Sequence, residues 1–235
     1  MIFKKITPAH HPVNPDNLVS LNNPISSNKK LVLFFVGWGM DEHLFSDYPR
    51  SGQDLMIAYD YSSLTLDENL LKGYEEIQVF AWSIGVWAAS QVLPKLQMQH
   101  YPISTCTAIN GTPFPIDDNR GIPVQLFQST LNTLSEKTLD KFRLRMCGSR
   151  EMLNHFLAKA PRRDIASLLT ELTAIEEQAT AQSATAFQWD EAYIGNDDRI
   201  FSPENQQRAW AHTPHKCVDM AHYPEKLFKQ LLQEI

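Results

Sequence analysis

The sequence predicts an α/β fold with a mostly parallel central sheet and an inserted block of helices. Three observations support this prediction. Short apolar runs bounded by turn residues recur along the chain, helical patterns separate them, and one long stretch (123–182) contains helical patterns alone. The runs are almost continuously apolar, which is typical of strands that are covered on both faces of a parallel sheet.

Six segments have the composition of buried strands, four of them strongly and the two nearest the C-terminus more weakly. In chain order they are Leu31–Val36, Leu55–Tyr59, Ile77–Phe80, Thr105–Ile109, Phe187–Ile194 and Lys216–Val218. The segment before them, residues 7–29, is rich in proline, asparagine and serine, and we expect it to form irregular surface.

Helical patterns occur in two settings. One helix is expected directly after Ser83 and another at the C-terminus, where a proline suits the first turn. Between them, four consecutive helices are predicted without an intervening strand: Val124–Leu134, Glu136–Met146, Arg150–Ala158 and Arg163–Ala179. Helices inserted into an α/β chain in this way indicate a cap, over about residues 120–182, on a single domain that spans residues 1–235.

The composition narrows the class of protein. Apolar residues make up 43% of the chain and charged residues 20%, which are proportions of an ordinary globular protein and argue against disorder. The three cysteines are far apart and form no C-x-x-C pair, which excludes a disulfide framework and a cysteine-built zinc site. Neither a signal peptide nor an apolar run of membrane-spanning length is visible, so we expect a cytoplasmic protein.

The charge is unevenly distributed. The net charge is −6, but residues 137–163 contain eight bases and only two acids, so that segment carries +6 and the remainder −12. Such a segment is either a solvated helical face or a docking surface for an acidic partner. The acidic remainder and the lack of a recognisable motif argue against nucleic-acid binding.

Ser83 lies between a predicted strand and a predicted helix, in the sequence A-W-S-I-G (81–85). A serine at a strand–turn–helix junction is the setting of the nucleophile elbow, G-x-S-x-G, whose tight turn needs small neighbours. Ala81 replaces the first glycine and is the least intrusive alternative. The other interpretation is an ordinary turn in which the serine caps the helix.

A serine nucleophile needs a histidine base, and the base needs a carboxylate. His222 lies on the loop between the last predicted strand and the last helix, whereas His212 and His215 precede that strand. Because parallel strands end at the same edge of the sheet, we expect Ser83 and His222 to lie close together there.

Two aspartates, Asp197 and Asp198, follow the preceding strand and compete for the role of the acid. They cannot both point at one imidazole. Asp198 fits the G-x-x-D-x-I pattern after the strand, so we predict that it orients His222, and we expect Asp197 to face solvent or Arg199.

The oxyanion of an acyl-transfer reaction needs backbone donors. The N–H of Ile84, which opens the helix after the nucleophile, is one candidate. The second is the N–H of Trp38 in V-G-W-G-M-D (36–41), where Gly37 and Gly39 let the backbone approach a substrate. The alternative is a glycine-rich turn with Trp38 in the core. No phosphate-binding motif is present in this loop.

Five motifs together resemble the BioG-type esterases of biotin synthesis: F-V-G-W-G-M-D (35–41), A-W-S-I-G (81–85), A-I-N-G-T-P-F-P-I-D-D (108–118), K-F-R-L-R-M-C-G (141–148) and H-Y-P (222–224). The resemblance covers most of residues 31–235. It implies an α/β-hydrolase fold and a serine carboxylesterase that hydrolyses the methyl ester of pimeloyl-[acyl-carrier protein] methyl ester. By position it implies Ser83 as nucleophile, His222 as base and Asp198 as acid, with Trp38 and Ile84 forming the oxyanion hole and no metal or cofactor.

The resemblance also suggests a purpose for the cap. Acyl-carrier protein is acidic, so five basic residues become candidates for docking it: Arg143, Arg145, Arg150, Arg162 and Arg163. Three apolar residues are candidates for the acyl-chain pocket: Leu126, Phe127 and Phe142. Two alternatives stay open, a general short-chain carboxylesterase or thioesterase, and a non-catalytic binding protein of the same fold with an idle serine. No nucleic-acid or membrane partner is expected.

Overall fold

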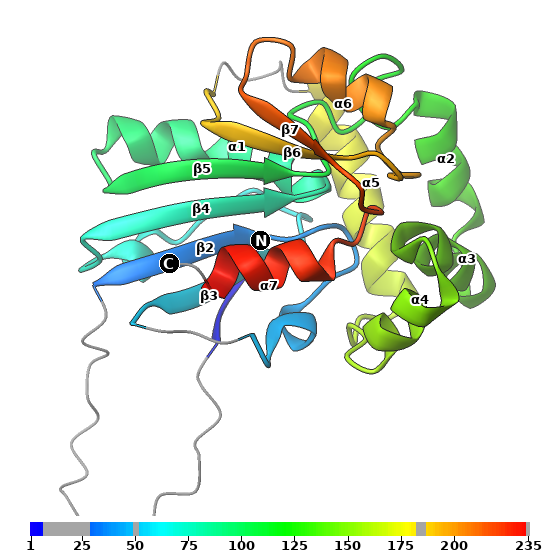
Figure 1. The fold of residues 1–235 in the computed structure, drawn as a ribbon, viewed down its shortest axis with the longest axis horizontal. Coiled ribbons are helices and arrows are strands. Elements are labelled where there is room, and N and C mark those ends of the chain that lie inside the picture. The colour runs from blue at the N-terminus through cyan, green and yellow to red at the C-terminus, as the bar shows by residue number, and fades with distance from the viewer. Residues whose placement is uncertain (7–28, 49–51, 182–186, 234–235) are drawn as a thin grey trace, which may run out of the picture.

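A seven-stranded sheet forms the centre of the computed structural model, which describes residues 1–6, 29–48, 52–181 and 187–233 (Figure 1). The strands are β1 (Ile2–Ile6), β2 (Lys30–Phe35), β3 (Asp54–Tyr59), β4 (Glu76–Trp82), β5 (Ile103–Ile109), β6 (Glu191–Gly195) and β7 (His215–Val218). Their order across the sheet is β1-β3-β2-β4-β5-β6-β7. Only β1 runs antiparallel to its neighbour among these pairs, so the predicted mostly parallel sheet is confirmed.

Helices cover the two faces of the sheet. α1 (Ile84–Met98) contacts β2, β4 and β5, and α7 (Glu225–Gln233) lies in front of the sheet in Figure 1. Phe228 of α7 packs against Phe34 of β2 and Trp82 of β4, with ring centroids 5.2 Å apart in both pairs. This cover on both faces explains why the central strands are apolar almost without a break.

Four helices follow one another between β5 and β6: α2 (Val124–Thr133), α3 (Glu136–Cys147), α4 (Arg150–Leu157) and α5 (Ile165–Ala181). Figure 1 shows them beyond the ends of β4 and β5, at the carboxyl edge of the sheet. Ser135 is the N-cap of α3, and Gly148 ends that helix with φ of 75°. We call α2–α5 the cap helices.

Some boundaries differ from those expected. α5 begins at Ile165 rather than Arg163, because the Asp164 side chain accepts the Ser167 N–H and so forms the N-terminal cap. β6 begins at Glu191, not Phe187. The expected irregular segment 7–29 lies, except for Lys29, outside the described residues.

One strand, one α-helix and two short 3-10 helices were not predicted from the sequence. The edge strand β1 (IFKKI) carries two lysines and only three apolar residues, so it lacks the continuous apolar pattern of a central strand. α6 (Pro203–Ala209) is short and polar, and only its N-cap Ser202 with Pro203 at the first position indicates a helix. Two short 3-10 helices, Glu42–Phe45 and Glu68–Leu71, complete the described elements. Within the described ranges, no helix has both the length and the apolarity needed to cross a membrane.

Candidate active site

Ser83 joins β4 to α1 in a strained backbone conformation, with φ of 60° and ψ of −133°. Its N–H donates to the Ile109 carbonyl at 3.0 Å, and its side chain makes no N-capping hydrogen bond to α1. The turn is packed so tightly that a Cβ on Gly85 would lie 2.3 Å from the Phe35 carbonyl oxygen, and one on Gly111 would lie 2.2 Å from the Ser83 carbonyl oxygen. This is the geometry of a nucleophile elbow, and there is no room for a side chain at Gly85, two residues after the serine, or at Gly111 on the neighbouring loop. The interpretation of Ser83 as a simple helix cap is therefore wrong.

Ser83, His222 and Asp198 form a continuous hydrogen-bonded chain. His222 Nε2 lies 2.9 Å from Ser83 Oγ, and His222 Nδ1 lies 2.9 Å from Asp198 Oδ2. All three side chains are buried, and the Phe201 ring stacks on the imidazole at an interplanar angle of 10°. The neutral tautomer with its proton on Nδ1 fits this chain, because it leaves Nε2 free to accept the Ser83 hydroxyl proton.

Asp198 is held in place by donors other than His222. Its Oδ1 accepts the backbone N–H groups of Ile200 and Phe201, at 2.8 and 3.0 Å, and its Oδ2 accepts the Gln206 side-chain amide at 3.0 Å. Asp197, by contrast, is exposed. Of the two aspartates, only Asp198, the one that the sequence pattern favours, contacts the imidazole.

Sequence reasoning missed Asn110, which connects the loop that carries Asp198 to the loop that carries His222. It is fully buried at the end of β5, with φ of 45°. Its Oδ1 accepts the Gly195 N–H at 2.7 Å, and its Nδ2 donates to the Ala221 and His222 carbonyls at 2.9 and 3.1 Å. One feature of the sequence could have indicated Asn110 as a site residue. It is a polar residue directly after a buried strand, and so lies at the same sheet edge as the other candidates.

The glycine-rich loop 36–41, which we call the oxyanion loop, lies beside Ser83. A Cβ on Gly37 would be 3.1 Å from Ser83 Cβ. Trp38 and Ile84 line the same pocket as Ser83, and no acceptor among the described residues takes a hydrogen bond from the backbone N–H of either one. The Trp38 side chain is buried and donates its indole N–H to the Leu168 carbonyl of α5 at 3.0 Å, so the loop also belongs to the core.

An apolar pocket opens from Ser83 and His222 into the cap helices. Leu126, Phe127 and Phe142, the three residues expected for an acyl chain, all line it. Ile122, Thr130, Met146, Leu172 and Ile200 also line it and were not expected.

A second cavity lies between α2 and α3 and shares four lining residues with the first: Leu126, Thr130, Phe142 and Arg145. Its other lining residues are mainly polar and include Ser129, Thr133, Thr138 and Lys141. The path from Ser83 therefore becomes more polar, and Lys141 and Arg145 make its second part basic.

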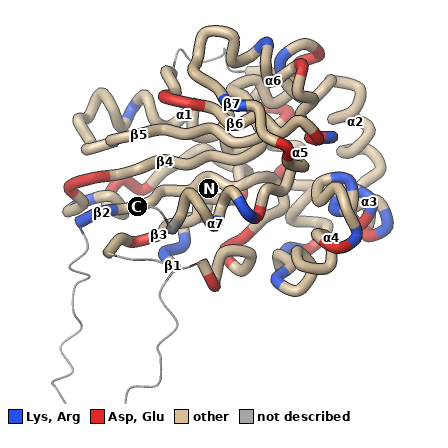
Figure 2. The backbone as a smooth tube through the Cα atoms, in the orientation of Figure 1, with Lys and Arg blue, Asp and Glu red and all other residues tan. Residues whose placement is uncertain are grey.

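The predicted basic segment lies on the cap, where Figure 2 shows Lys and Arg gathered on α3, with others at the start of α4 and in the chain that follows it. Arg150 and Arg162 are exposed, and Arg143 is partly buried, 3.6 Å from Asp140. Arg145 lines both cavities, and its Nε is buried without a hydrogen-bond partner in the described structure.

Arg163 does not belong to this surface, and its assignment as a docking residue is wrong. Its side chain is only 7% exposed and forms ion pairs with Glu171 at 2.5 Å and Asp60 at 3.3 Å. Because the guanidinium is itself buried and paired with both carboxylates, it is not available to an incoming protein.

Comparison with solved structures supports the fold and the family. BioG from Haemophilus influenzae superimposes with a TM-score of 0.82 and 30% sequence identity, over 97% of each chain. A lipase-esterase related protein from Clostridium acetobutylicum is similar in fold alone, with a TM-score of 0.59 and 12% identity over 89% of this chain and 96% of that one.

Sequence relatives extend the comparison. The chain is 50% identical over 206 residues to a protein of Bacteroides fragilis named malonyl-[acyl-carrier protein] O-methyltransferase, covering 87% of this chain but only 41% of that protein. It is 37% identical to an uncharacterized protein of Haemophilus influenzae, over 77% of this chain and 82% of that one. The family model described as pimeloyl-ACP methyl esterase BioG matches residues 23–232. With the α/β-hydrolase fold and the buried serine elbow, this match shows that the chain belongs to the BioG family.

Proposed function

We propose that this chain is a serine carboxylesterase that hydrolyses the methyl ester of pimeloyl-[acyl-carrier protein] methyl ester, giving pimeloyl-[acyl-carrier protein] and methanol in biotin synthesis. The observation that carries the proposal is the hydrogen-bonded Ser83–His222–Asp198 chain at the base of an apolar pocket. Membership of the BioG family supports the choice of substrate.

The proposed chemistry uses only groups of this chain and water. His222 Nε2 takes the proton of Ser83 Oγ as the oxygen attacks the ester carbonyl, and Asp198 stabilises the resulting imidazolium. The Trp38 and Ile84 N–H groups donate to the oxyanion. His222 then protonates the methoxy group, which leaves as methanol. Water, deprotonated by His222, attacks the acyl-enzyme, and the pimeloyl carboxylate is released as Ser83 recovers its proton.

The two adjoining cavities support a direction for the substrate. The ester at the free end of the pimeloyl chain reaches Ser83, and the methylene chain occupies the apolar pocket beside Leu126, Phe127 and Phe142. The polar outer cavity would then hold the carrier's prosthetic arm, with Arg145 and Lys141 near the exit. Burial of the methylene groups favours binding by roughly 0.8 kcal/mol per group.

We assign hydrolysis rather than methyl transfer to this chain. The polar residues at its site form a serine–histidine–aspartate arrangement, which serves acyl transfer to water. The similar protein named a methyltransferase is matched over only 41% of its length. Its whole activity therefore does not transfer to this chain.

Mass spectrometry of pimeloyl-[acyl-carrier protein] methyl ester, incubated with wild type or with Ser83→Ala, tests the proposal. We expect the carrier-bound acyl chain to lose the mass of one methylene group with wild type only. Cleavage of the whole acyl group would instead identify a thioesterase. An unchanged substrate with both proteins, together with no labelling of Ser83 by a fluorophosphonate, would contradict catalysis and favour a binding protein.

Charge reversal on the cap tests carrier docking. Lys141→Glu and Arg150→Glu are expected to raise KM for the carrier-bound ester about tenfold and to weaken its salt dependence, because surface charges mainly steer association. kcat for a small p-nitrophenyl ester should not change. Lys72→Glu, an exposed lysine just before β4 and outside the cap, is the control. Equal effects on both substrates would argue against docking at this surface.

A further inference from the structure

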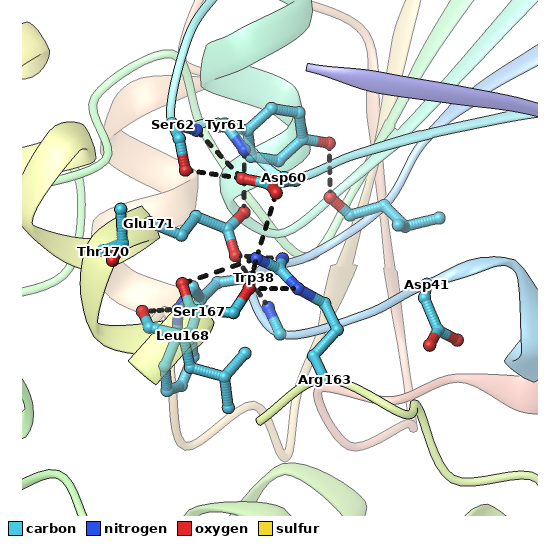
Figure 3. Close-up of polar contacts among 12 residues, drawn as sticks. Trp38, Asp41, Asp60, Tyr61, Ser62, Arg163, Ser167, Leu168, Thr170 and Glu171 are labelled. Atoms are coloured by element: carbon cyan, nitrogen blue, oxygen red, sulfur yellow. Dashed lines mark hydrogen bonds and ion pairs between the residues drawn. The ribbon is translucent and has the colours of Figure 1, made fainter. Parts of the chain in front are cut away.

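We infer that Glu171, a carboxylate buried in cap helix α5, is a positioning residue for the oxyanion loop. Glu171 is fully buried, does not line the pocket that contains Ser83, and takes no part in the proposed chemistry. Figure 3 shows it at the junction of α5, the oxyanion loop and the turn after β3. The inference rests on the proposed function, since it concerns how the oxyanion hole of that reaction is kept in place.

Every neighbour that hydrogen-bonds to Glu171 is a donor. Oε1 accepts the Tyr61 backbone N–H at 2.9 Å, and Oε2 accepts Arg163 Nη1 at 2.5 Å and, more weakly, the Gly39 N–H at 3.5 Å. Burial raises the pKa of this carboxyl, and the Arg163 charge opposes that shift. If the carboxyl were protonated, its O–H would be a fourth donor among three N–H donors and would have no acceptor in this set. The surroundings therefore match the ionised form.

Arg163 also contacts two groups besides the Glu171 carboxylate. Its guanidinium contacts Asp60 Oδ2 at 3.3 Å, and its Nη2 donates to Ser167 Oγ at 2.6 Å (Figure 3). The bridge therefore joins the start of α5 to the turn after β3. Because both Arg163 and Glu171 are buried, solvent screens this pair little.

The network reaches the oxyanion loop on both sides of Trp38. Before Trp38, the Tyr61 hydroxyl donates to the Val36 carbonyl at 2.6 Å, while the Tyr61 N–H is held by Glu171. After Trp38, the Gly39 N–H points to Glu171. Trp38 is anchored to α5 directly, through its indole N–H and the Leu168 carbonyl. The backbone that carries the Trp38 N–H is thus clamped by one cap helix.

This arrangement gives α5 a role beyond covering the pocket. Oxyanion donors act only when they are already aimed at the position of the developing charge, and a displacement of about 1 Å can cost on the order of 100-fold in rate. Loss of the Glu171 charge should therefore reduce transition-state stabilisation more than substrate binding.

The test is Glu171→Gln, assayed with a p-nitrophenyl ester that does not need carrier docking. The amide would place an NH₂ group against the donors that now surround the carboxylate. We expect kcat, corrected for active sites by fluorophosphonate titration, to fall 10-fold or more, with KM within twofold of wild type. Affinity for a trifluoromethyl ketone, whose serine adduct carries an oxyanion, should weaken in parallel.

Glu177→Gln is the matched control, because it makes the same change at an exposed position of the same helix, and it should behave as wild type. If Glu171→Gln does not fold, Tyr61→Phe decides. It removes only the hydroxyl, which donates to the Val36 carbonyl at 2.6 Å and to the Ala58 carbonyl at 3.1 Å, and it should lower kcat several-fold at constant KM.

Wild-type kcat in the folded Glu171→Gln variant, or a change confined to KM, would overturn the inference while leaving the proposed esterase intact. If Glu171→Gln fails to fold, a wild-type kcat in Tyr61→Phe would overturn the inference instead. Failure of the wild type itself to hydrolyse the ester would instead reject the proposed function, and the inference with it.

Discussion

Asp198→Asn is expected to lower kcat for ester hydrolysis by about 10⁴-fold without unfolding the protein. Asp198 accepts a hydrogen bond from His222 Nδ1 at 2.9 Å, and its Oδ1 is fixed by two backbone N–H groups. The backbone donors would keep the asparagine oxygen at that position and turn its NH₂ group towards the imidazole. The NH₂ group would donate to Nδ1 and move the imidazole proton to Nε2, where it blocks proton transfer from Ser83. Steady-state kinetics with a p-nitrophenyl ester measures this loss.

Asp197→Asn is the matched control, because it makes the same change one residue earlier at an exposed position. It should retain nearly wild-type kcat. A large loss in Asp197→Asn together with a small loss in Asp198→Asn would reverse the assignment of the acid. Circular dichroism of both variants would exclude unfolding as the cause.

Asn110→Ala is expected to lower both the stability and the activity. The substitution leaves the buried Gly195 N–H and the partly buried Ala221 carbonyl without their partner, and a buried unsatisfied group costs about 1–3 kcal/mol. It also places alanine at φ of 45°, a region that asparagine tolerates better. We expect the free energy of unfolding in urea to fall by about 2–5 kcal/mol.

The activity should fall too, because Asn110 ties the turn before Asp198 to the loop that carries His222. The His222 carbonyl keeps one donor, the Trp82 indole N–H at 2.7 Å, so the loop should be loosened rather than released. Asn196→Ala, which removes an exposed side chain bonded to Asp219, is the control and should change stability by no more than about 0.5 kcal/mol. Unchanged kcat in a destabilised Asn110→Ala would limit this residue to a structural role.

The two cavities and the contacts of Glu171 suggest that different cap helices serve different steps of the proposed reaction. α2 and α3 line the path that we assign to the acyl chain and the carrier arm. α5 is tied to the oxyanion loop by Glu171 and the Leu168 carbonyl. Cap substitutions on α2 and α3 should therefore change KM and substrate preference, whereas substitutions of buried polar groups on α5 should change kcat.

Local pattern in the sequence determined the central strands, the cap helices and the serine elbow. Apolar runs predict buried strands because side chains alternate between two covered faces, and Ser135 and Gly148 mark the ends of α3 because helix termini need particular residues. The serine, the acid and the histidine each follow a predicted strand, in that order, which predicts that Ser83 and His222 lie at one edge of the sheet. In the structure Ser83 Oγ lies 2.9 Å from His222 Nε2.

Only the tertiary structure decided which polar groups meet. The burial of Arg163 against Asp60 and the bridging role of Asn110 depend on contacts between segments far apart in the chain. A local pattern carries no information on such pairings. The edge strand β1 was missed for the same reason, because its hydrogen bonds come from β3, some fifty residues away, and its own apolar pattern is weak. Arg163, which the sequence assigns to a docking surface, is buried in the structure because Glu171 and Asp60 neutralise its charge there.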